Sequence, residues 1–389
     1  MKLQFSKYQN TKSLLNLSNQ WSLKKFDELL KDVTRTGTKI PSSDYEETGL
    51  YAVIDQGKGL IAGYSNLENP IQGEKIIFGD HTRVLKYIES DSFHIGADGV
   101  KVLENKVPEK VLTKYIFYYL SSVNIPNTGY NRHFKYLKEI VIPVPGIEIQ
   151  LKLVEVFDSV KNLIIKRESQ IEALDELTQS IFSKMFENNH LVEKPLNEYV
   201  NKIISGKSLA GNVPSQYKVI NTSAVSYKEF LPDKSKYLPE DYVPPENHLI
   251  NKGDLLVSRM NTSELVGAAA YVFEQVEKLT IPDRIWKLEM DNSKLNPVYA
   301  WYFINQKRFR DSVTGISTGT SGSMKNIAQQ KYLQLLIKVP PIELQNEFEN
   351  KLILIRNNKK RLLQSKKVLN NLYTSVLQKA FKGELFQEI

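Results

Sequence analysis

Polar and basic turns recur at two matching places of this 389-residue chain. Gly79-Asp80-His81-Thr82-Arg83 follows a predicted strand, and Arg259-Met260-Asn261-Thr262-Ser263 stands 180 residues later, again after a predicted strand. Arginine pairs with guanine edges, asparagine pairs with adenine edges, and threonine methyl groups contact thymine. Any one of these residues also fits an ordinary solvated loop, but the repeated placement favours turns that read base edges.

Other turns carry groups that suit phosphate. The turns Tyr130–His133 and Thr318–Asn326 each precede a long predicted helix, and Gln56–Gly59 and Gly206–Ser208 are further basic turns. Small hydroxyl residues, free backbone N–H groups and lysines suit phosphate oxygens. The candidate DNA-binding residues from all these turns are Lys58, His81, Thr82, Arg83, Tyr130, Arg132, His133, Lys207, Arg259, Asn261, Thr320, Ser321, Ser323 and Lys325.

Motifs for catalysis or metal binding are missing from the sequence. Gly206-Lys207-Ser208 resembles the end of a phosphate-binding loop, but Asn201 stands where that loop needs its first glycine. The chain has no Gly-x-Ser-x-Gly nucleophile turn and no cysteine, and its five histidines have no partner at metal-ligand spacing. We therefore predict no catalytic residue and no metal site in this chain.

Two alternatives remain open at the level of sequence. Asp98 with Glu104-Asn105-Lys106 faintly resembles the acidic constellation of a metal-dependent endonuclease, without a preceding Pro-Asp or a second acid nearby. Cleavage of DNA by the isolated chain with Mg²⁺ tests that alternative. The second alternative is a coiled-coil scaffold whose end domains bind proteins, and DNA binding with a steep salt dependence argues against it.

The elements that must position these turns occur twice. Ile147-Glu148-Ile149-Gln150 returns 195 residues later as Ile342-Glu343-Leu344-Gln345, and Phe26-Asp27-Glu28 returns 170 residues later as Leu196-Asn197-Glu198. The second globular copy is thus 25 residues longer than the first. This period is too long for a solenoid. It indicates two domains that share a scaffold and differ in their loops.

The globular copies are predicted to be α+β domains. Short β-branched or aromatic runs bounded by Gly, Asp and Asn predict strands. These runs are Leu50–Ile54, Lys75–Phe78, Val84–Ile88, Tyr217–Ile220, Leu255–Val257 and Ala269–Phe273. One helix is expected in each copy, at Leu112–Ser122 and Pro297–Lys307.

A long helix is predicted after each globular copy. Apolar residues recur every seven positions from Leu153 to Ile181, interrupted by Arg167, and again from Phe348 to Val376, without an internal Pro or Gly. Such a stripe must face another helix. Between these positions lie Val156, Leu163 and Leu177 in the first copy, which are expected to complete the seam. The sister positions in the second copy are Lys351, Asn358 and Leu372, with Leu352 beside the seam. We predict one antiparallel, intramolecular coiled coil; packing of each helix on its own domain is the alternative.

Composition and charge agree with a DNA-binding protein. The formal net charge is +8 and the pI is about 9.1, a modest basic excess that also occurs in lysine-rich proteomes. The segment Met1–Gln20 is polar, so we expect no signal peptide. No run of 18 apolar residues exists, so we expect no membrane span and a cytoplasmic location.

Taken in order along the chain, these motifs resemble a known family. They are Trp21 with Phe26-Asp27-Glu28, the strand ending in Phe78–Arg83, Pro145-Gly146-Ile147-Glu148-Ile149-Gln150, Gly319–Ile327 and Val339–Gln345. The chain resembles the DNA specificity subunit of type I restriction–modification systems from about Trp21 to Phe386. Gly146 is a mild departure, because the family often has Pro there. The resemblance implies a first target recognition domain at 1–146, coiled-coil helices at 147–190 and 342–389, and a second target recognition domain at 191–341.

The resemblance also implies a mechanism and partners. Each target recognition domain reads one half of a split, asymmetric site in double-stranded DNA, and the coiled coil sets the spacing between them. Two methyltransferase subunits bind this subunit and methylate adenine, and added restriction subunits cut DNA. S-adenosylmethionine, ATP and Mg²⁺ belong to those partners, so no cofactor is expected on this chain, which is expected to be non-catalytic.

Overall fold

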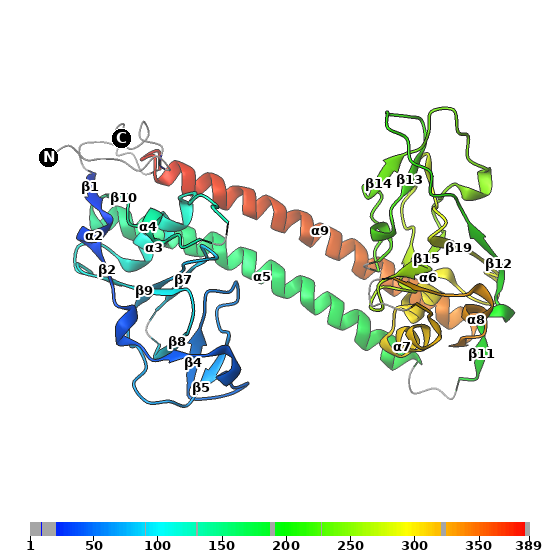
Figure 1. Ribbon diagram of the computed structural model, residues 1–389, viewed down its shortest axis with the longest axis horizontal. Coiled ribbons are helices and arrows are strands. Elements are labelled where there is room, and N and C mark those ends of the chain that lie inside the picture. Colours follow the sequence, from blue (N-terminus) through cyan, green and yellow to red (C-terminus); the bar gives the residue numbers. More distant parts are fainter. Residues whose placement is uncertain are drawn as a thin grey trace. The chain divides into compact units, whose positions relative to one another are not determined.

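The computed structural model describes residues 9, 21–89, 91–129, 131–186, 191–226, 228–319 and 324–385. The chain divides into two compact units (Figure 1). Unit 1 comprises Met1–Ile171 and Arg361–Ile389, and unit 2 comprises Glu172–Lys360. Each unit contains one globular copy and one end of each of two long helices. The domain boundaries at 146, 190 and 341 stay a prediction, because these units divide the long helices between them.

Unit 1 contains two four-stranded sheets, in the orders β2-β9-β6-β7 and β3-β8-β4-β5, and the two-stranded pair β1–β10. Its strands are β1 (Ser22–Lys25), β2 (Leu30–Asp32), β3 (Lys39–Ile40), β4 (Tyr51–Ile54), β5 (Gly63–Ser65), β6 (Lys75–Gly79), β7 (Leu85–Ile88), β8 (Phe93–Gly96), β9 (Val100–Asn105) and β10 (Val141–Val144). Its short helices are α2 (Phe26–Leu29), α3 (Thr113–Ser122) and α4 (Phe134–Leu137). Because side chains alternate along β6, Ile76 and Phe78 enter the core below α3, and Ile77 enters the core of the second sheet.

Unit 2 repeats this plan with additions. Its strands are β11 (Glu193–Pro195), β12 (Val200–Ser205), β13 (Lys218–Ile220), β14 (Ser235–Tyr237), β15 (Leu255–Ser258), β16 (Met260–Asn261), β17 (Ala269–Tyr271), β18 (Leu279–Thr280), β19 (Ile285–Met290), β20 (Lys325–Asn326) and β21 (Leu336–Lys338). Its helices are α6 (Pro297–Ile304), α7 (Lys307–Ile316) and α8 (Gln329–Leu333). The sheet β12-β19-β15-β17 matches β2-β9-β6-β7 strand for strand, and α6 matches α3. The strand runs and both short helices predicted from sequence are confirmed, whereas α2, α4, α7 and α8 were not predicted.

The structure corrects the predicted match between the central strands by one residue. The sequence offset of 180 pairs Ile76 with Leu256. Ile76, however, lies in the core below α3, whereas Leu256 lies in the core beside the sheet β14-β13-β18. Ile76 and Phe78 instead correspond to Leu255 and Val257, which enter the core below α6. A shift of one residue moves every side chain to the other face of a sheet, so sheet face decides the alignment. The true offset is 179, and Arg259 corresponds to Asp80.

Two long helices, α5 (Ile147–Phe186) and α9 (Ile342–Ala380), pack side by side within each unit (Figure 1). In unit 1 the Phe157 and Phe381 rings lie 5.5 Å apart, and Arg167 Nε donates to Ser365 Oγ at 3.1 Å. In unit 2 Asp175 pairs with Lys359 at 2.6 Å, and the Phe182 and Phe348 rings lie 5.5 Å apart. Numbers that rise along α5 meet numbers that fall along α9. The two helices are therefore antiparallel, as predicted.

The residues predicted to complete the seam between the two long helices are wrong by one position. Leu163, Leu177 and Leu372 remain 47%, 46% and 46% exposed. Phe157 is buried instead, and Ile164 lies one position after Leu163 and is less exposed. The run Leu163-Ile164-Ile165 offers three apolar neighbours, so spacing alone does not select the one that faces the partner helix.

The repeated glutamine of the Ile-Glu-x-Gln motif is a buried structural clamp. In unit 1 the Gln150 side chain accepts from the Leu112 N–H at 2.9 Å and donates to the carbonyls of Lys110 and Pro145. Gln345 in unit 2 makes the same three bonds, accepting from the Asn296 N–H at 2.8 Å and donating to Lys294 and Pro340. Each glutamine fixes the start of a long helix to the segment before α3 or α6. In the described residues, no helix is long and apolar enough to cross a membrane.

Candidate nucleic-acid interface

In unit 1 the predicted reading turn is the four-residue segment 80–83 between β6 and β7. The Arg83 N–H donates to the Gly79 carbonyl at 2.7 Å, and the Gly79 N–H donates to the Val84 carbonyl at 2.8 Å, which closes the turn. Arg83 has a φ of +63°, a left-handed conformation that is uncommon for residues other than glycine. Its Nη1 donates to the Ile125 carbonyl at 3.1 Å. The guanidinium is therefore held at a fixed place, with its other donors not used by this bond.

Two neighbouring turns are bonded to the reading turn of unit 1. Thr82 Oγ1 donates to the Gln56 carbonyl at 2.6 Å, which attaches the turn that bears the exposed Lys58. The backbone N–H groups of His133 and Phe134 donate to Asp80, at 2.8 Å to its carbonyl and 2.7 Å to its carboxylate. Three separate candidate turns thus converge on one edge of the sheet.

The histidines of these turns do not lie equally open. His133 is fully buried: its Nδ1 donates to the Asp80 carbonyl at 2.9 Å, and its Nε2 accepts from the Thr128 N–H at 3.3 Å. Its ring therefore positions the turn, and its expected contact with DNA does not fit this placement. His81 is half-buried, and Arg132 beside His133 is exposed. Tyr130 lies outside the described residues.

In unit 2 a small antiparallel ribbon gathers the candidate residues. The strands β16 and β20 pair Asn261 with Lys325 and Met260 with Asn326. Arg259 precedes this ribbon; its Nε donates to Asn326 Oδ1 at 3.3 Å, and its guanidinium lies 5.6 Å from the Trp286 ring centroid. The ribbon therefore places Lys325 beside Arg259 and Asn261, although more than sixty residues separate Lys325 from these two in the sequence.

Hydrogen bonds within unit 2 orient these candidates. The Asn261 amide donates to Ser226 Oγ at 2.8 Å and to Ser258 Oγ at 3.2 Å, and Lys325 Nζ donates to the Gly319 carbonyl at 3.0 Å. Both side chains are half-buried. Thr320, Ser321 and Ser323 lie outside the described residues, so their placement stays a prediction.

The turn that bears Lys207 and the residue Arg259 both bond to the backbone segment 282–284, so they lie close together. The Gly206 N–H donates to the Pro282 carbonyl at 3.2 Å, and the Arg259 N–H donates to the Arg284 carbonyl at 3.0 Å. A Cβ on Gly206 would stand 1.8 Å from the Ile281 carbonyl oxygen, so only glycine permits this approach. Lys207 is exposed. Burial, with the nearby ammonium groups of Lys207 and Lys287, lowers the pKa of His248.

Sequence reasoning missed several exposed polar residues near these turns. In unit 1 a groove of about 400 Å³ beside Arg83 is lined by Ser121, in the last turn of α3, and by Asn124, which follows α3. Lys135 and Lys138 extend the predicted Arg132 turn, and Arg284 is exposed beside Arg259. The basic spacing of Arg132, Lys135 and Lys138 was visible in the sequence. The groove was not, because it joins segments about forty residues apart.

The residues of the endonuclease alternative are not brought together. Asp98 lies two residues before β9 and Glu104 lies near the other end of that strand; the stretch from Val100 to Glu104 alone spans roughly 13 Å. Glu104 pairs with Lys31 and, at 3.0 Å, with Lys75. Lys106 Nζ donates to the Asp27 carbonyl. No group of three metal-ligating side chains occurs in the part of the chain that the structure describes.

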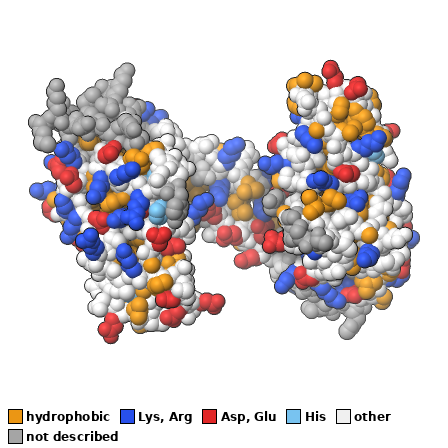
Figure 2. All heavy atoms as spheres, viewed as in Figure 1, with side chains coloured by type: hydrophobic (Ala, Val, Ile, Leu, Met, Phe, Trp, Pro, Cys, Tyr) orange, Lys and Arg blue, Asp and Glu red, His pale blue; other side chains and the backbone are white. Residues whose placement is uncertain are grey.

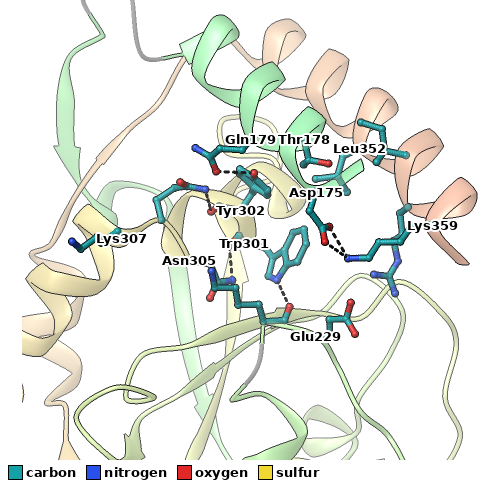
Figure 3. Close-up of a pocket in the computed structure, with 14 residues that line it drawn as sticks. Asp175, Thr178, Gln179, Glu229, Trp301, Tyr302, Asn305, Lys307, Leu352 and Lys359 are labelled. Atoms are coloured by element: carbon teal, nitrogen blue, oxygen red, sulfur yellow. Dashed lines mark hydrogen bonds and ion pairs between the residues drawn. The ribbon is translucent and has the colours of Figure 1, made fainter. Parts of the chain in front are cut away.

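A pocket of about 680 Å³ in unit 2 lies between α6 and the adjoining ends of the long helices (Figure 3). Trp301 Nε1 donates to the Lys228 carbonyl at 2.9 Å, and Asp175 on one wall pairs with Lys359 at 2.6 Å. Arg356 lies 4.1 Å from the Phe273 ring centroid. These charged groups contact one another or a ring, so the pocket is a junction that fixes α6 against the helices.

Fold and turns together define a class: a duplicated α+β binding protein with polar turns at a sheet edge of each copy. The family model of the type I restriction modification DNA specificity domain matches residues 19–174. The chain is 20% identical to the MjaVIII specificity subunit of Methanocaldococcus jannaschii, covering 95% of this chain and 96% of that protein. It is 22% identical to the EcoR124I/EcoR124II specificity subunit of Escherichia coli, covering 81% of each.

Another similarity is local, and two concern the fold. The chain is 27% identical over 127 residues to the Escherichia coli EcoEI specificity subunit, and this match spans 21% of that protein. The S subunit of the M. genitalium type I system has the same fold, with a TM-score of 0.60 and 14% identity, covering 99% of this chain and 100% of that one. A chain from a type I assembly gives a TM-score of 0.53 at 15% identity, covering 95% and 99%. The predicted resemblance is thereby confirmed: residues 19–174 match the type I specificity domain, and most of the chain is similar to type I specificity subunits.

Proposed function

We propose that this chain directs a type I restriction–modification complex to a bipartite, asymmetric DNA site. One observation carries the proposal: the same sheet edge bears different reading segments in the two copies. The turn after β6 has four residues, 80–83, whereas the segment between the corresponding partners Ser258 and Ala268 has nine, 259–267. A shared scaffold with different edges is suited to reading two different half-sites.

Each copy is assigned to one half-site. In unit 1 Arg83 reads base edges, with the groove beside Asn124, and Lys58 contributes to the phosphate contacts. In unit 2 Arg259 and Asn261 read, and Lys207 and Lys325 bind phosphates. Because the reading segments differ in length and content, the two half-sites differ in sequence.

The chemistry is assigned to partner subunits. Two methyltransferase subunits carry S-adenosylmethionine and receive the flipped adenine, since a base inside a duplex is out of reach. Restriction subunits carry ATP and Mg²⁺. This chain is non-catalytic and acts in the cytoplasm. The separation of Asp98 from Glu104 supports this assignment over an endonuclease, and the basic turns support it over a protein scaffold.

The test is methylation mapping of the complex reconstituted from this chain and its methyltransferase subunits. We expect methylated adenines in two defined half-sites separated by an undefined spacer. A chimera that replaces residues 191–341 by those of a relative changes one half-site and leaves the other intact. A single continuous motif, or a change in both half-sites, contradicts the proposal.

A further inference from the structure

A basic segment at residues 132–138 lies beside the reading turn of unit 1 in space, although it is distant from that turn in sequence. Arg132, Lys135 and Lys138 recur every three residues: Lys135 lies in α4, Arg132 lies two residues before the helix, and Lys138 follows it directly. All three are exposed, and none forms an ion pair with the residues that the structure describes. We name the stretch from Arg132 to Lys138 the α4 basic segment.

This segment is fixed to the reading turn through Phe134. The Phe134 N–H donates to Asp80 Oδ1 at 2.7 Å, and its buried ring lies 6.2 Å from the Phe78 ring. Lys138 Nζ lies 4.9 Å from the centre of the Phe134 ring, and Lys101 Nζ lies 5.1 Å from it. The positive charges therefore stand beside the base-reading residues. Figure 2 shows Lys and Arg side chains gathered on this unit.

Lys101 is held differently from Lys138. It pairs with Asp32 at 3.0 Å. Burial alone raises the pKa of Asp32, but hydrogen bonds from Thr34 and the Lys101 ammonium outweigh it and lower that pKa. Lys101 therefore has a carboxylate partner, whereas Arg132, Lys135 and Lys138 are available for an anion from outside.

The second copy lacks this segment. The strand position of Lys101 is taken by Trp286, since Phe78 pairs with Lys101 and the corresponding Val257 pairs with Trp286. Trp286 is fully buried against Tyr332, with ring centres 5.6 Å apart, below α7. At the offset of 195, Arg132, Lys135 and Lys138 correspond to Ile327, Gln330 and Leu333.

The difference between the two copies indicates whether the cations of the α4 basic segment are needed for folding or for binding. The matching helix of unit 2, α8, carries a single exposed lysine, Lys331, so the fold itself does not require three cations at this place. Exposed lysines and arginines contribute little to stability by themselves. Arginine and lysine side chains bind phosphate oxygens, and such contacts position a protein on the duplex next to the bases that it reads.

We propose that the α4 basic segment binds the sugar–phosphate backbone of duplex DNA next to the first half-site, independently of base sequence. This inference rests on the proposed function and assigns the anchoring contacts unequally to the two copies. An acidic surface on a protein subunit is the competing occupant, and the test separates the two.

The test compares Lys135→Gln/Lys138→Gln with the wild-type full chain in complex with its methyltransferase subunits. Binding to a random-sequence duplex is measured at several salt concentrations. Each phosphate contact contributes roughly 0.9 to the slope of log affinity against log salt, so the slope should fall by about 1.8. The methylated sequence should stay the same. The matched control is Lys110→Gln, because Lys110 is an exposed lysine between β9 and α3, outside the α4 basic segment; it should leave the slope unchanged.

The outcomes keep this inference apart from the proposed function. An unchanged salt slope in the double variant, with wild-type site-specific methylation, overturns the inference alone. Loss of assembly with the methyltransferase subunits, at an unchanged slope, assigns the segment to a protein surface and also overturns it. Absence of any bipartite site for the wild-type complex overturns the proposed function. Equal melting temperatures of the variants establish that folding is intact.

Discussion

The two globular copies agree in their cores and differ at one sheet edge. Tyr115 and Tyr299 occupy the same place, are fully buried, and donate their hydroxyl hydrogens to matching carbonyls of Pro143 and Lys338. Gln150 and Gln345 likewise make matching sets of bonds. Buried polar groups need partners, so positions that supply them change little between copies. The turns after the central strands differ, because each copy makes its own contacts there: Asp80 accepts from His133 and Phe134 in unit 1, whereas Arg259 donates to Asn326 in unit 2.

The difference extends to the sheet face beside these turns. Unit 1 leaves this face open to Lys101 and the α4 basic segment, whereas unit 2 covers it with α7. Phe309 and Val313 of α7 are buried in the core that contains Trp286 and Tyr332. One scaffold therefore supports either a charged surface or an apolar one at this place, depending on whether a helix follows α6.

The largest expected effect comes from exchanging the residues at one corresponding strand position, Lys101 in unit 1 and Trp286 in unit 2. Trp286→Lys places an ammonium in a fully buried site and removes the packing on Tyr332, so we expect a cost of about 3–5 kcal/mol. The reciprocal Lys101→Trp loses only a partly exposed ion pair with Asp32, and the cost should be about 0–1 kcal/mol. Urea unfolding followed by circular dichroism measures both. Similar losses of unfolding free energy for the two substitutions would contradict the assignment of Trp286 to a buried apolar face and of Lys101 to an open one.

A second experiment tests whether the glutamine clamps are equivalent. Gln150→Leu leaves the Leu112 N–H and two carbonyls without these partners, and Gln345→Leu does the same at Asn296. We expect each to cost about 1–3 kcal/mol, with similar values for the two copies. Gln364→Leu, at an exposed position of α9, is the control and should change the unfolding free energy little. A large cost for one clamp alone would mean that the copies do not share this device.

The fold was predictable from the sequence as far as repetition and periodicity reach. The motif at Ile147 and Ile342, the heptads and the short strand runs predict two α+β copies and two antiparallel helices. Periodicity left the register open by one residue in two places, at Leu163 in the seam and at Ile76 in the central strand. In each place neighbouring residues are apolar, so only the packed core selects which side chain turns inward.

The candidate site was predictable in part. The turns containing Arg83 and Arg259 were found by composition, and the structure places each among other predicted turns. The buried role of His133 was not predictable, because its partner Asp80 lies 53 residues away. The sequence gives no periodic signal for the meeting of Asn261 with Lys325 in a two-residue ribbon. Contacts between distant loops depend on tertiary structure that local patterns do not encode.

A third prediction distinguishes the two arginines as readers of separate half-sites. Arg259→Ala should cost about 1–3 kcal/mol of discrimination in the second half-site only. Arg83→Gly should cost a similar amount in the first half-site only, while its stability stays equal or rises, because glycine adopts a φ of +63° without strain. Methylation-site mapping and thermal melting measure these effects. A loss in the opposite half-site would reverse the assignment of copies to half-sites.

The smallest expected effect concerns two lysines of unit 2. Lys207 is exposed in a turn held by Gly206, and Lys325 is half-buried and bonded to the Gly319 carbonyl. Either substitution by alanine should weaken binding to all sequences about equally and lower the salt slope by roughly 0.9. The measurement is binding to specific and random duplexes at several salt concentrations, alongside methylation mapping.

These two lysines also test whether unit 2 separates phosphate binding from base reading in the way proposed for unit 1. Lys325 is the cross-strand partner of Asn261, a proposed base reader, whereas the turn that bears Lys207 meets Arg259 only through the backbone of residues 282–284. If Lys325→Ala changes the methylated sequence while Lys207→Ala changes only the slope, the ribbon acts as one reading element and Lys325 belongs with the readers. If both change only the slope, unit 2 separates anchoring from reading in the same way as the α4 basic segment and Arg83 do in unit 1.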